Sequence, residues 1–146
     1  GVKLNILFAD DFVRVIPDLM AHKADMVAAN LSITDERNRK IAFSTPYLQT
    51  TQQLVYRNGT RKPRQLRDLA GKNIAVLANS SHAENLRKLQ ESYPDVSWSE
   101  TGEDVETLIE LVDSGHLDFT IADSIDASSL KRFYPELRVG FNLTNE

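Results

Sequence analysis

The chain has 146 residues, a net charge of −4 and no cysteine. A hydrophobic fraction of 41% suffices for one compact domain or two small lobes. The mild acidity is not expected of a nucleic-acid-binding protein, and the lack of cysteine excludes disulfides, thiolate metal sites and a cysteine nucleophile. No apolar run reaches the roughly 20 residues needed to span a bilayer. We therefore expect a globular domain with no cofactor, no metal, no nucleic-acid partner and no membrane span in this part of the chain.

The first 57 residues mix strand-like and helical patterns. Residues 2–8 alternate apolar and polar side chains, which predicts a half-buried strand. Residues 11–22 have apolar residues at helical spacing, and Pro17 belongs in the first turn of the predicted helix. Residues 24–29 predict a short apolar strand, residues 34–37 are typical of a helix N-terminus, and residues 50–57 predict another strand.

Residues 58–63 form a connector that contains Gly59 and Pro63. Basic residues are densest from Arg57 to Arg67, which we interpret as a solvated surface, with a phosphate site as the less favoured alternative. Beyond the connector, helices are predicted over residues 65–70, 80–93, 103–114 and 125–133, and strands over 73–78, 96–99, 119–122 and 137–143. Strands that alternate with helices over short loops predict an α/β fold with mostly parallel sheets.

Two segments at an offset of 93 residues share one pattern. Residues 16–30 and 109–123 each read as a helix, a tight turn, an aspartate, a four-residue apolar strand and a polar tip. We therefore predict two lobes of like design, namely a partial first lobe over residues 1–57 and a second lobe over 58–143, followed by a tail at 144–146. The abrupt start on a strand pattern indicates a piece of a longer protein. We expect a well-ordered second lobe and exposed apolar strand faces in the first.

Polar residues follow the predicted strands at their carboxyl ends, where ligands bind in open α/β sheets. Asn30 and Ser32 follow the strand of the first lobe, and Asp123 ends the corresponding strand of the second. Ser80 and Ser81 lie at a predicted helix start, where free backbone N–H groups attract anions and polar groups. Both serines are at least as well explained as helix caps, and Asp123 is an equally good cap for the helix that follows it.

Two opposite charges among these segments suit an α-amino ligand. The guanidinium of Arg37 can hold a carboxylate through two parallel hydrogen bonds, and the carboxylate of Asp123 can hold an ammonium group. Taken alone, the charged stretch around Arg37 is better explained as a solvated helix face. We assign His22, His82 and His116 to surface or turn positions, since their spacing indicates no metal site.

Longer stretches resemble a known family. The segment AANLSITDERNRKIAFSTPYL (28–48) is similar to the bacterial extracellular solute-binding proteins, family 3, of the polar amino-acid class. The segments TTQQLVYRNGTRKPRQLRDLAG (50–71), LDFTIADS (117–124) and YPELRV (134–139) resemble the solute-binding-like module of the membrane-bound lytic murein transglycosylase F group. The resemblance covers nearly the whole chain and implies a two-lobe, periplasmic-binding-protein-like (type 2) fold, with the first lobe incomplete.

The resemblance also implies site residues. It assigns the ligand α-carboxylate to Arg37, a hydroxyl and N–H contact to Ser32, a backbone carbonyl to Asn30, and the ligand ammonium to Asp123. The loop of the second lobe that contacts the ligand corresponds to residues 79–81, with Ser80 and Ser81 as hydroxyl donors. This loop lacks the glycine usual in the family, which puts a close approach of its backbone to the ligand in question.

The expected function is a non-catalytic, regulatory module that binds an amino acid, a peptide or a muropeptide, linked to a transglycosylase domain elsewhere in its parent protein. The expected location is the periplasm, with a tether to the outer membrane through that parent. The alternatives are a binding protein of an amino-acid ABC transporter and the sensor domain of a receptor. A dehydratase-type enzyme on the same fold is a further alternative, which would need Glu36 or Glu84 as an acid or base.

Overall fold

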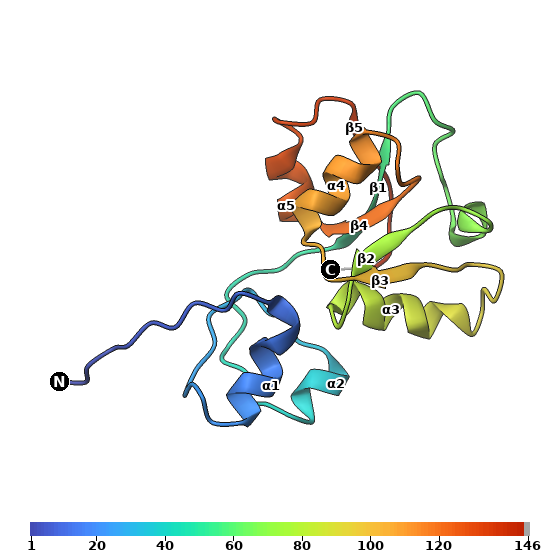
Figure 1. Ribbon diagram of the computed structural model, residues 1–146. Helices are drawn as coiled ribbons and strands as arrows, with labels where there is room; N and C mark the ends of the chain where they lie inside the picture. Colours follow the sequence, from blue (N-terminus) through green and yellow to red (C-terminus); the bar gives the residue numbers. More distant parts are fainter. Residues whose placement is uncertain (145–146) are drawn as a thin grey trace. The chain divides into compact units, whose positions relative to one another are not determined.

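The computed structural model describes residues 1–144 and divides into two compact units, residues 1–46 and the chain from Tyr47 onward (Figure 1). The division lies before the predicted boundary after residue 57, because the strand that we placed in the first lobe pairs within the second unit. Of the predicted tail at 144–146, residues 145 and 146 lie outside the described residues.

The unit of residues 1–46 is built from short helical segments. It contains a 3-10 helix η1 (Phe12–Arg14), α1 (Val15–Met20) and α2 (Asp35–Asn38). Pro17 lies in the first turn of α1, as predicted. The Oγ1 of Thr34 accepts a hydrogen bond from the backbone N–H of Arg37 at 3.2 Å, which confirms the predicted cap of α2.

The two strands predicted in this unit are wrong. Residues 2–8 and 24–29 form no strand, and the alternating side chains of the first segment face solvent, with Val2 and Phe8 at 101% and 90% exposure. The sequence has the period of a strand, but a strand also needs a neighbour for its backbone N–H and C=O groups. Within residues 1–46 no such neighbour is present. Both segments of the predicted repeat therefore contain a helix, but a strand follows the helix in the second segment only.

The second unit contains nearly all the regular structure. Each strand and helix predicted beyond residue 50 is present, although the third strand begins three residues later than expected and the first helix is of the 3-10 type. The elements are β1 (Gln52–Arg57), η2 (Leu66–Leu69), β2 (Ala75–Leu77), α3 (Ser81–Gln90), β3 (Ser99–Thr101), α4 (Val105–Asp113), β4 (Thr120–Asp123), α5 (Ser124–Leu130) and β5 (Leu137–Asn142).

The prediction of mostly parallel sheets is wrong. The three-stranded sheet β4-β1-β5 is antiparallel throughout, whereas the two-stranded sheet β2-β3 is parallel. The cause is β1, which lies between β4 and β5 and runs against both. The strands β4 and β5 therefore share one direction, as do β2 and β3, and a parallel bridge from Ile74 to Phe119 aligns β2 with β4. Helices connect these four strands in sequence and give them the expected common direction. The strand β1 was predicted, but its direction was not, because no helix connects it to either of its neighbours in the sheet.

The core lies on both faces of this sheet. Alternate residues of β1 and β4 point to opposite sides, so that Leu54 and Ile121 pack in one cluster and Val55 and Ala122 in another, all with no solvent exposure. The first cluster includes residues of α3, and the second includes residues of α4 and α5 (Figure 1). Burial on both faces explains why the sequence of β4 is apolar without a polar alternation.

Candidate ligand-binding site at the strand tips

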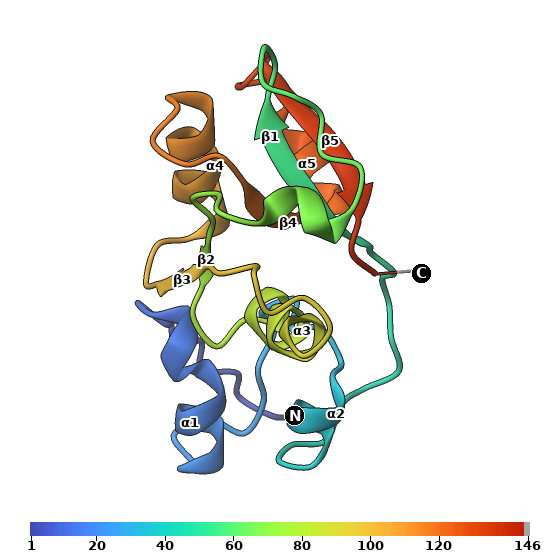
Figure 2. The same ribbon diagram turned by 90° about the vertical axis from the view of Figure 1, so that its right-hand side faces the viewer.

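The ends of three elements meet at one edge of the second unit. Asp123 ends β4 and lies opposite Gln52, the first residue of β1. The parallel bridge between Ile74 and Phe119 directs the carboxyl end of β2 to the same edge, and α3 begins four residues after that strand. Figure 2 shows α3 below β2 and β4 in a view turned by 90°. The topology thus brings together the tip residues that the sequence placed in this half of the chain.

Ser80 is a helix cap. Its Oγ accepts a hydrogen bond from the N–H of Ala83 at 3.2 Å and donates one to the carbonyl of Leu77 at 2.6 Å. The residue before it, Asn79, has a φ of 55°, a left-handed conformation that asparagine tolerates better than other side chains. The loop therefore adopts a glycine-like backbone without the glycine that the family usually has there.

Ser81 belongs to a buried amide network that the sequence did not predict. Its Oγ accepts a hydrogen bond from the Nε2 of Gln52 at 3.1 Å, and the Oε1 of Gln52 accepts one from the Nδ2 of Asn85 at 2.9 Å. Gln52 and Ser81 are both buried, at 5% and 7% exposure. A glutamine at the start of β1, before the apolar centre of the strand, is the signal that could have identified it. The network fixes the start of α3 against the start of β1.

Asp123 precedes α5 but does not cap it with its side chain. Its Oδ1 instead lies 3.3 Å from the Nε2 of His82, in the first turn of α3. His82 is only 5% exposed, so its assignment to the surface or a turn is wrong. From the sequence, His82 is recognisable only as a residue near the start of a predicted helix. Its burial could not be predicted, because it results from the packing of α3 beside the end of β4.

The other ring nitrogen of His82, Nδ1, is buried and has no hydrogen-bond partner among residues 1–144. A neutral imidazole has one N–H, and a carboxylate only accepts hydrogen bonds. The arrangement therefore favours the form with its hydrogen on Nε2, donating to Asp123. One carboxylate oxygen of Asp123 is engaged in this way, and the side chain as a whole is 21% exposed.

Negative charge accumulates beside this pair. Burial raises the pKa of Asp126, the negative charge of Asp123 raises it further, and His82 opposes the shift. Ser124, between the two aspartates in the first turn of α5, bonds to the chain before β1, with its Oγ 3.0 Å from the Oγ1 of Thr50. Its backbone N–H also donates to the carbonyl of Thr51 at 2.9 Å. The edge thus combines fixed hydroxyls with an electrostatic environment that favours a cation.

The remaining predicted site residues lie in the unit of residues 1–46. Arg37 is 3% exposed and donates from Nη1 to the carbonyl of Ser32 at 3.2 Å, so its alternative role on a solvated helix face is wrong. Only Val15 and Arg37 are buried in this unit. Asn30 has a φ of 48° and is exposed. The structure thus brings Arg37 to Ser32 in one unit, and groups Asp123, Ser80 and Ser81 in the other.

Residues 1–144 contain neither a cluster of metal ligands nor a membrane-spanning helix. No group of three or more histidine, cysteine, aspartate or glutamate side chains is arranged to hold a metal ion. None of the helices has both the length and the apolar character needed to cross a membrane.

Known proteins match this chain in sequence and in structure. The family described as bacterial extracellular solute-binding proteins, family 3, matches residues 1–96. The chain is 38% identical over 145 residues to a membrane-bound lytic murein transglycosylase F from Saccharophagus degradans, covering 99% of this chain and 29% of that protein. It is 40% identical over 146 residues to a membrane-bound lytic murein transglycosylase F 1 from Alkalilimnicola ehrlichii, covering 99% and 30%.

Solved structures of amino-acid-binding proteins share the fold. A truncated, arginine-bound ArgBP from T. maritima superposes with a TM-score of 0.83 at 27% identity, covering 96% of this chain and 64% of that one. An ancestral arginine-binding protein bound to arginine gives a TM-score of 0.80 at 27% identity, covering 90% and 58%.

The chain spans less than a third of the transglycosylase relatives and about 60% of the structural neighbours. The chain corresponds to part of a periplasmic-binding-protein fold. The matching family is described as extracellular, and the transglycosylase relatives are named as membrane-bound proteins. The family profile covers most of the chain and includes both the Arg37 and the Ser80 segments. The chain belongs to the bacterial extracellular solute-binding proteins, family 3.

Proposed function

We propose that this chain is a non-catalytic module that binds the α-amino end of an amino acid, a peptide or a muropeptide, and that it regulates a transglycosylase domain elsewhere in a longer protein. The observation that carries the proposal is the state of Asp123. Its carboxylate lies at the end of the buried strand β4 and does not cap α5, the helix that follows. The buried side chain of His82 orients it instead. A carboxylate held in this way at a strand tip is suited to accept hydrogen bonds from an ammonium group.

Arg37 supplies the opposite charge in the proposal. The Arg37 side chain is buried, at 3% exposure, and the Nη1 of its guanidinium donates to the carbonyl of Ser32. A ligand carboxylate would accept further hydrogen bonds from the same planar group. Within residues 1–46, Ser32 and Asn30 would contact a ligand beside Arg37. Within the second unit, Ser81 and the capped start of α3 would contact a ligand beside Asp123. Ser80 would act through the conformation of the loop, since its hydroxyl is already engaged.

The relatives support the broader setting. Their names describe lytic murein transglycosylases, and this chain matches less than a third of their length, which leaves room for a catalytic domain outside the match. We propose a periplasmic location, with a tether to the outer membrane through the parent protein. A muropeptide offers both a peptide carboxylate and an ammonium group, so it fits the proposed pair of charges.

A binding protein of an amino-acid transporter, or a receptor sensor, would use the same residues, and the arginine-bound structural neighbours favour that alternative. A dehydratase is less well supported. One of its two candidate acids, Glu36, forms an exposed ion pair with Lys40 at 2.8 Å, which is the usual state of a surface carboxylate.

Isothermal titration of the chain, and of the longest natural protein that contains it, with amino acids, short peptides and muropeptides tests the proposal. We expect saturable binding of one of these classes. Loss of a charge-assisted contact costs about 1.5–3 kcal/mol, so Asp123→Asn and Arg37→Ala should each weaken binding roughly 10- to 100-fold. Glu136→Gln, at an exposed position on the loop before β5, serves as a charge-matched control. The absence of binding in both proteins, or unchanged affinity in both site variants, would overturn the proposal.

A further inference from the structure

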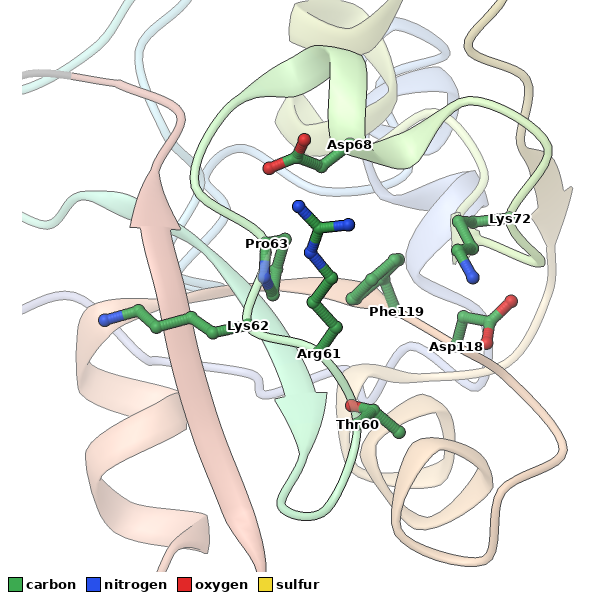
Figure 3. Close-up of a pocket in the computed structure, with 8 residues that line it drawn as sticks. All are labelled: Thr60, Arg61, Lys62, Pro63, Asp68, Lys72, Asp118 and Phe119. Carbon is green, nitrogen blue, oxygen red and sulfur yellow. The ribbon is translucent and has the colours of Figure 1, made fainter.

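A pocket lies beside the connector, at the end of β4 opposite the strand tips. It has a volume of about 190 Å³ and is lined by Thr60, Arg61, Lys62, Pro63, Asp68, Lys72, Asp118 and Phe119 (Figure 3). Phe119 immediately precedes β4, whereas Asp123 ends it, so the four-residue strand separates this pocket from the candidate site by roughly 13 Å at about 3.3 Å per residue. The pocket is therefore a separate feature of the second unit.

The two carboxylates of the pocket are held by the backbone. The Oδ2 of Asp68 accepts hydrogen bonds from the N–H groups of Arg64 and Gln65 at 2.8 and 3.3 Å. The Oδ2 of Asp118 accepts one from the N–H of Asn73 at 2.8 Å. The bonds to Asp68 close the turn before η2, and the bond to Asp118 links the segment before β2 to the segment before β4. Both aspartates thus have a structural role that explains their presence without a ligand.

The cations of the pocket have no comparable role. The side chains of Arg61 and Lys72 form no hydrogen bond and no ion pair with any residue that the structure describes. In Figure 3 the guanidinium of Arg61 points toward Asp68 and the ammonium group of Lys72 toward Asp118, whereas the ammonium group of Lys62 points away. Phe119 and Pro63 are buried and form a rigid apolar base. Both aspartates already accept hydrogen bonds from backbone N–H groups, so the donors of Arg61 and Lys72 remain available to a small anion.

The size of the pocket limits the ligand. A volume of about 190 Å³ holds several water molecules but lies below the roughly 300–1,000 Å³ of pockets that enclose drug-sized ligands. A guanidinium and an ammonium group recognise the oxygens of phosphate or carboxylate groups. We infer that residues 60–72 and 118–119 form a second binding site, for a small oxyanion of the phosphate or carboxylate class, in which Arg61 and Lys72 are the donors. This inference does not depend on the proposed function of the strand tips.

NMR titrations of the 146-residue chain at constant ionic strength provide the test, with inorganic phosphate in one series and succinate in another. We expect saturable shifts of the backbone amides in residues 60–72 and 118–119, and none at residues 80–82. Arg61→Ala should weaken binding about tenfold or more, while Lys62→Ala, the matched control, should leave it within about twofold.

Comparison of the two series distinguishes a phosphate from a carboxylate ligand, since the tighter of the two identifies the preferred class. Asp123→Asn should leave binding at this pocket unchanged, which separates the result from that for the strand tips. The inference is overturned if the shifts grow linearly without saturation for both anions, or if Arg61→Ala and Lys62→Ala weaken binding equally.

Discussion

The pair formed by His82 and Asp123 is the most informative local feature of the second unit. A hydrogen bond from a buried imidazole fixes one oxygen of the carboxylate, so that the other can be presented to a ligand without the cost of ordering the side chain. Asp123 and Asp126 are the charged groups that face the ring from β4 and α5, and Glu84 lies on the same helix as His82. His82 thus has a positioning role in the proposed site.

This role predicts the effect of removing the imidazole. In His82→Ala the carboxylate of Asp123 loses the hydrogen bond that orients it. Loss of one hydrogen bond costs about 1–1.5 kcal/mol, so we expect the affinity for an α-amino ligand to fall about tenfold in calorimetric titrations. His82→Gln, whose amide nitrogen can replace the Nε2 donor, should recover most of that affinity. An equal loss in both variants would exclude the positioning role of His82.

Asp126 predicts a pH effect on stability. Because burial and Asp123 raise its pKa in the folded protein, folding favours the protonated acid. Its contribution is therefore fully favourable below the unfolded pKa of about 3.9 and is lost as the pH rises through the raised value. Asp126→Asn should stabilise the protein slightly at pH 7 and have no effect near pH 3.5. Urea denaturation of both proteins at the two pH values measures the difference. A gain of equal size at pH 3.5 would contradict this account.

The sequence alone identified the polar tip residues but not their partners. Asp123, Ser80, Ser81 and Arg37 were all found from their positions after strands or from the family resemblance. His82 and Gln52 were missed, since their roles depend on packing between α3, β1 and β4 rather than on local pattern. Of the two serines, Ser80 is a helix cap and Ser81 belongs to the amide network, and a ligand contact for either stays a prediction.

Among the elements, β1 decides the architecture of the second unit. Its position between β4 and β5, and against both, converts a set of parallel strands into an antiparallel sheet. Sequence patterns predicted the existence of every element in this unit because their apolar periods are strong. They could not predict the direction of β1, which depends on pairings between residues about 65 to 90 positions apart in the chain.

Packing between the connector and β5 gives a prediction at this scale. A Cβ at Gly140 would lie 2.8 Å from the Cγ of Pro63 and 3.3 Å from its carbonyl oxygen, so Gly140→Ala forces β5 away from the connector. We expect a loss of roughly 1–3 kcal/mol in the free energy of unfolding, measured by urea denaturation. Gly102→Ala is the matched control, because a Cβ there meets nothing within 4 Å. If the two variants have the same free energy of unfolding, the connector moves to accommodate the new methyl group without destabilising the protein.

At the scale of the whole molecule, the two units differ in how much they bury. Residues 1–46 bury only Val15 and Arg37, whereas the second unit has clusters on both faces of its sheet. Val2, Leu4 and Phe8 are exposed, as expected of apolar side chains in an incomplete lobe, but they belong to no strand. Such side chains gain little stability from folding unless another surface covers them.

This imbalance predicts separate stabilities for the two units. Backbone amides are protected from exchange in proportion to the free energy of the opening that exposes them. We expect the amides of β1, β4 and α4 to exchange through global unfolding, and those of α1 and α2 to exchange through local opening at a cost several kcal/mol lower. A shortened chain that begins at Tyr47 should then unfold in urea at nearly the midpoint of the full chain, because almost all the buried apolar surface is retained. If the shortened chain loses cooperativity, or if the two units exchange at equal rates, residues 1–46 contribute to the core more than their burial indicates.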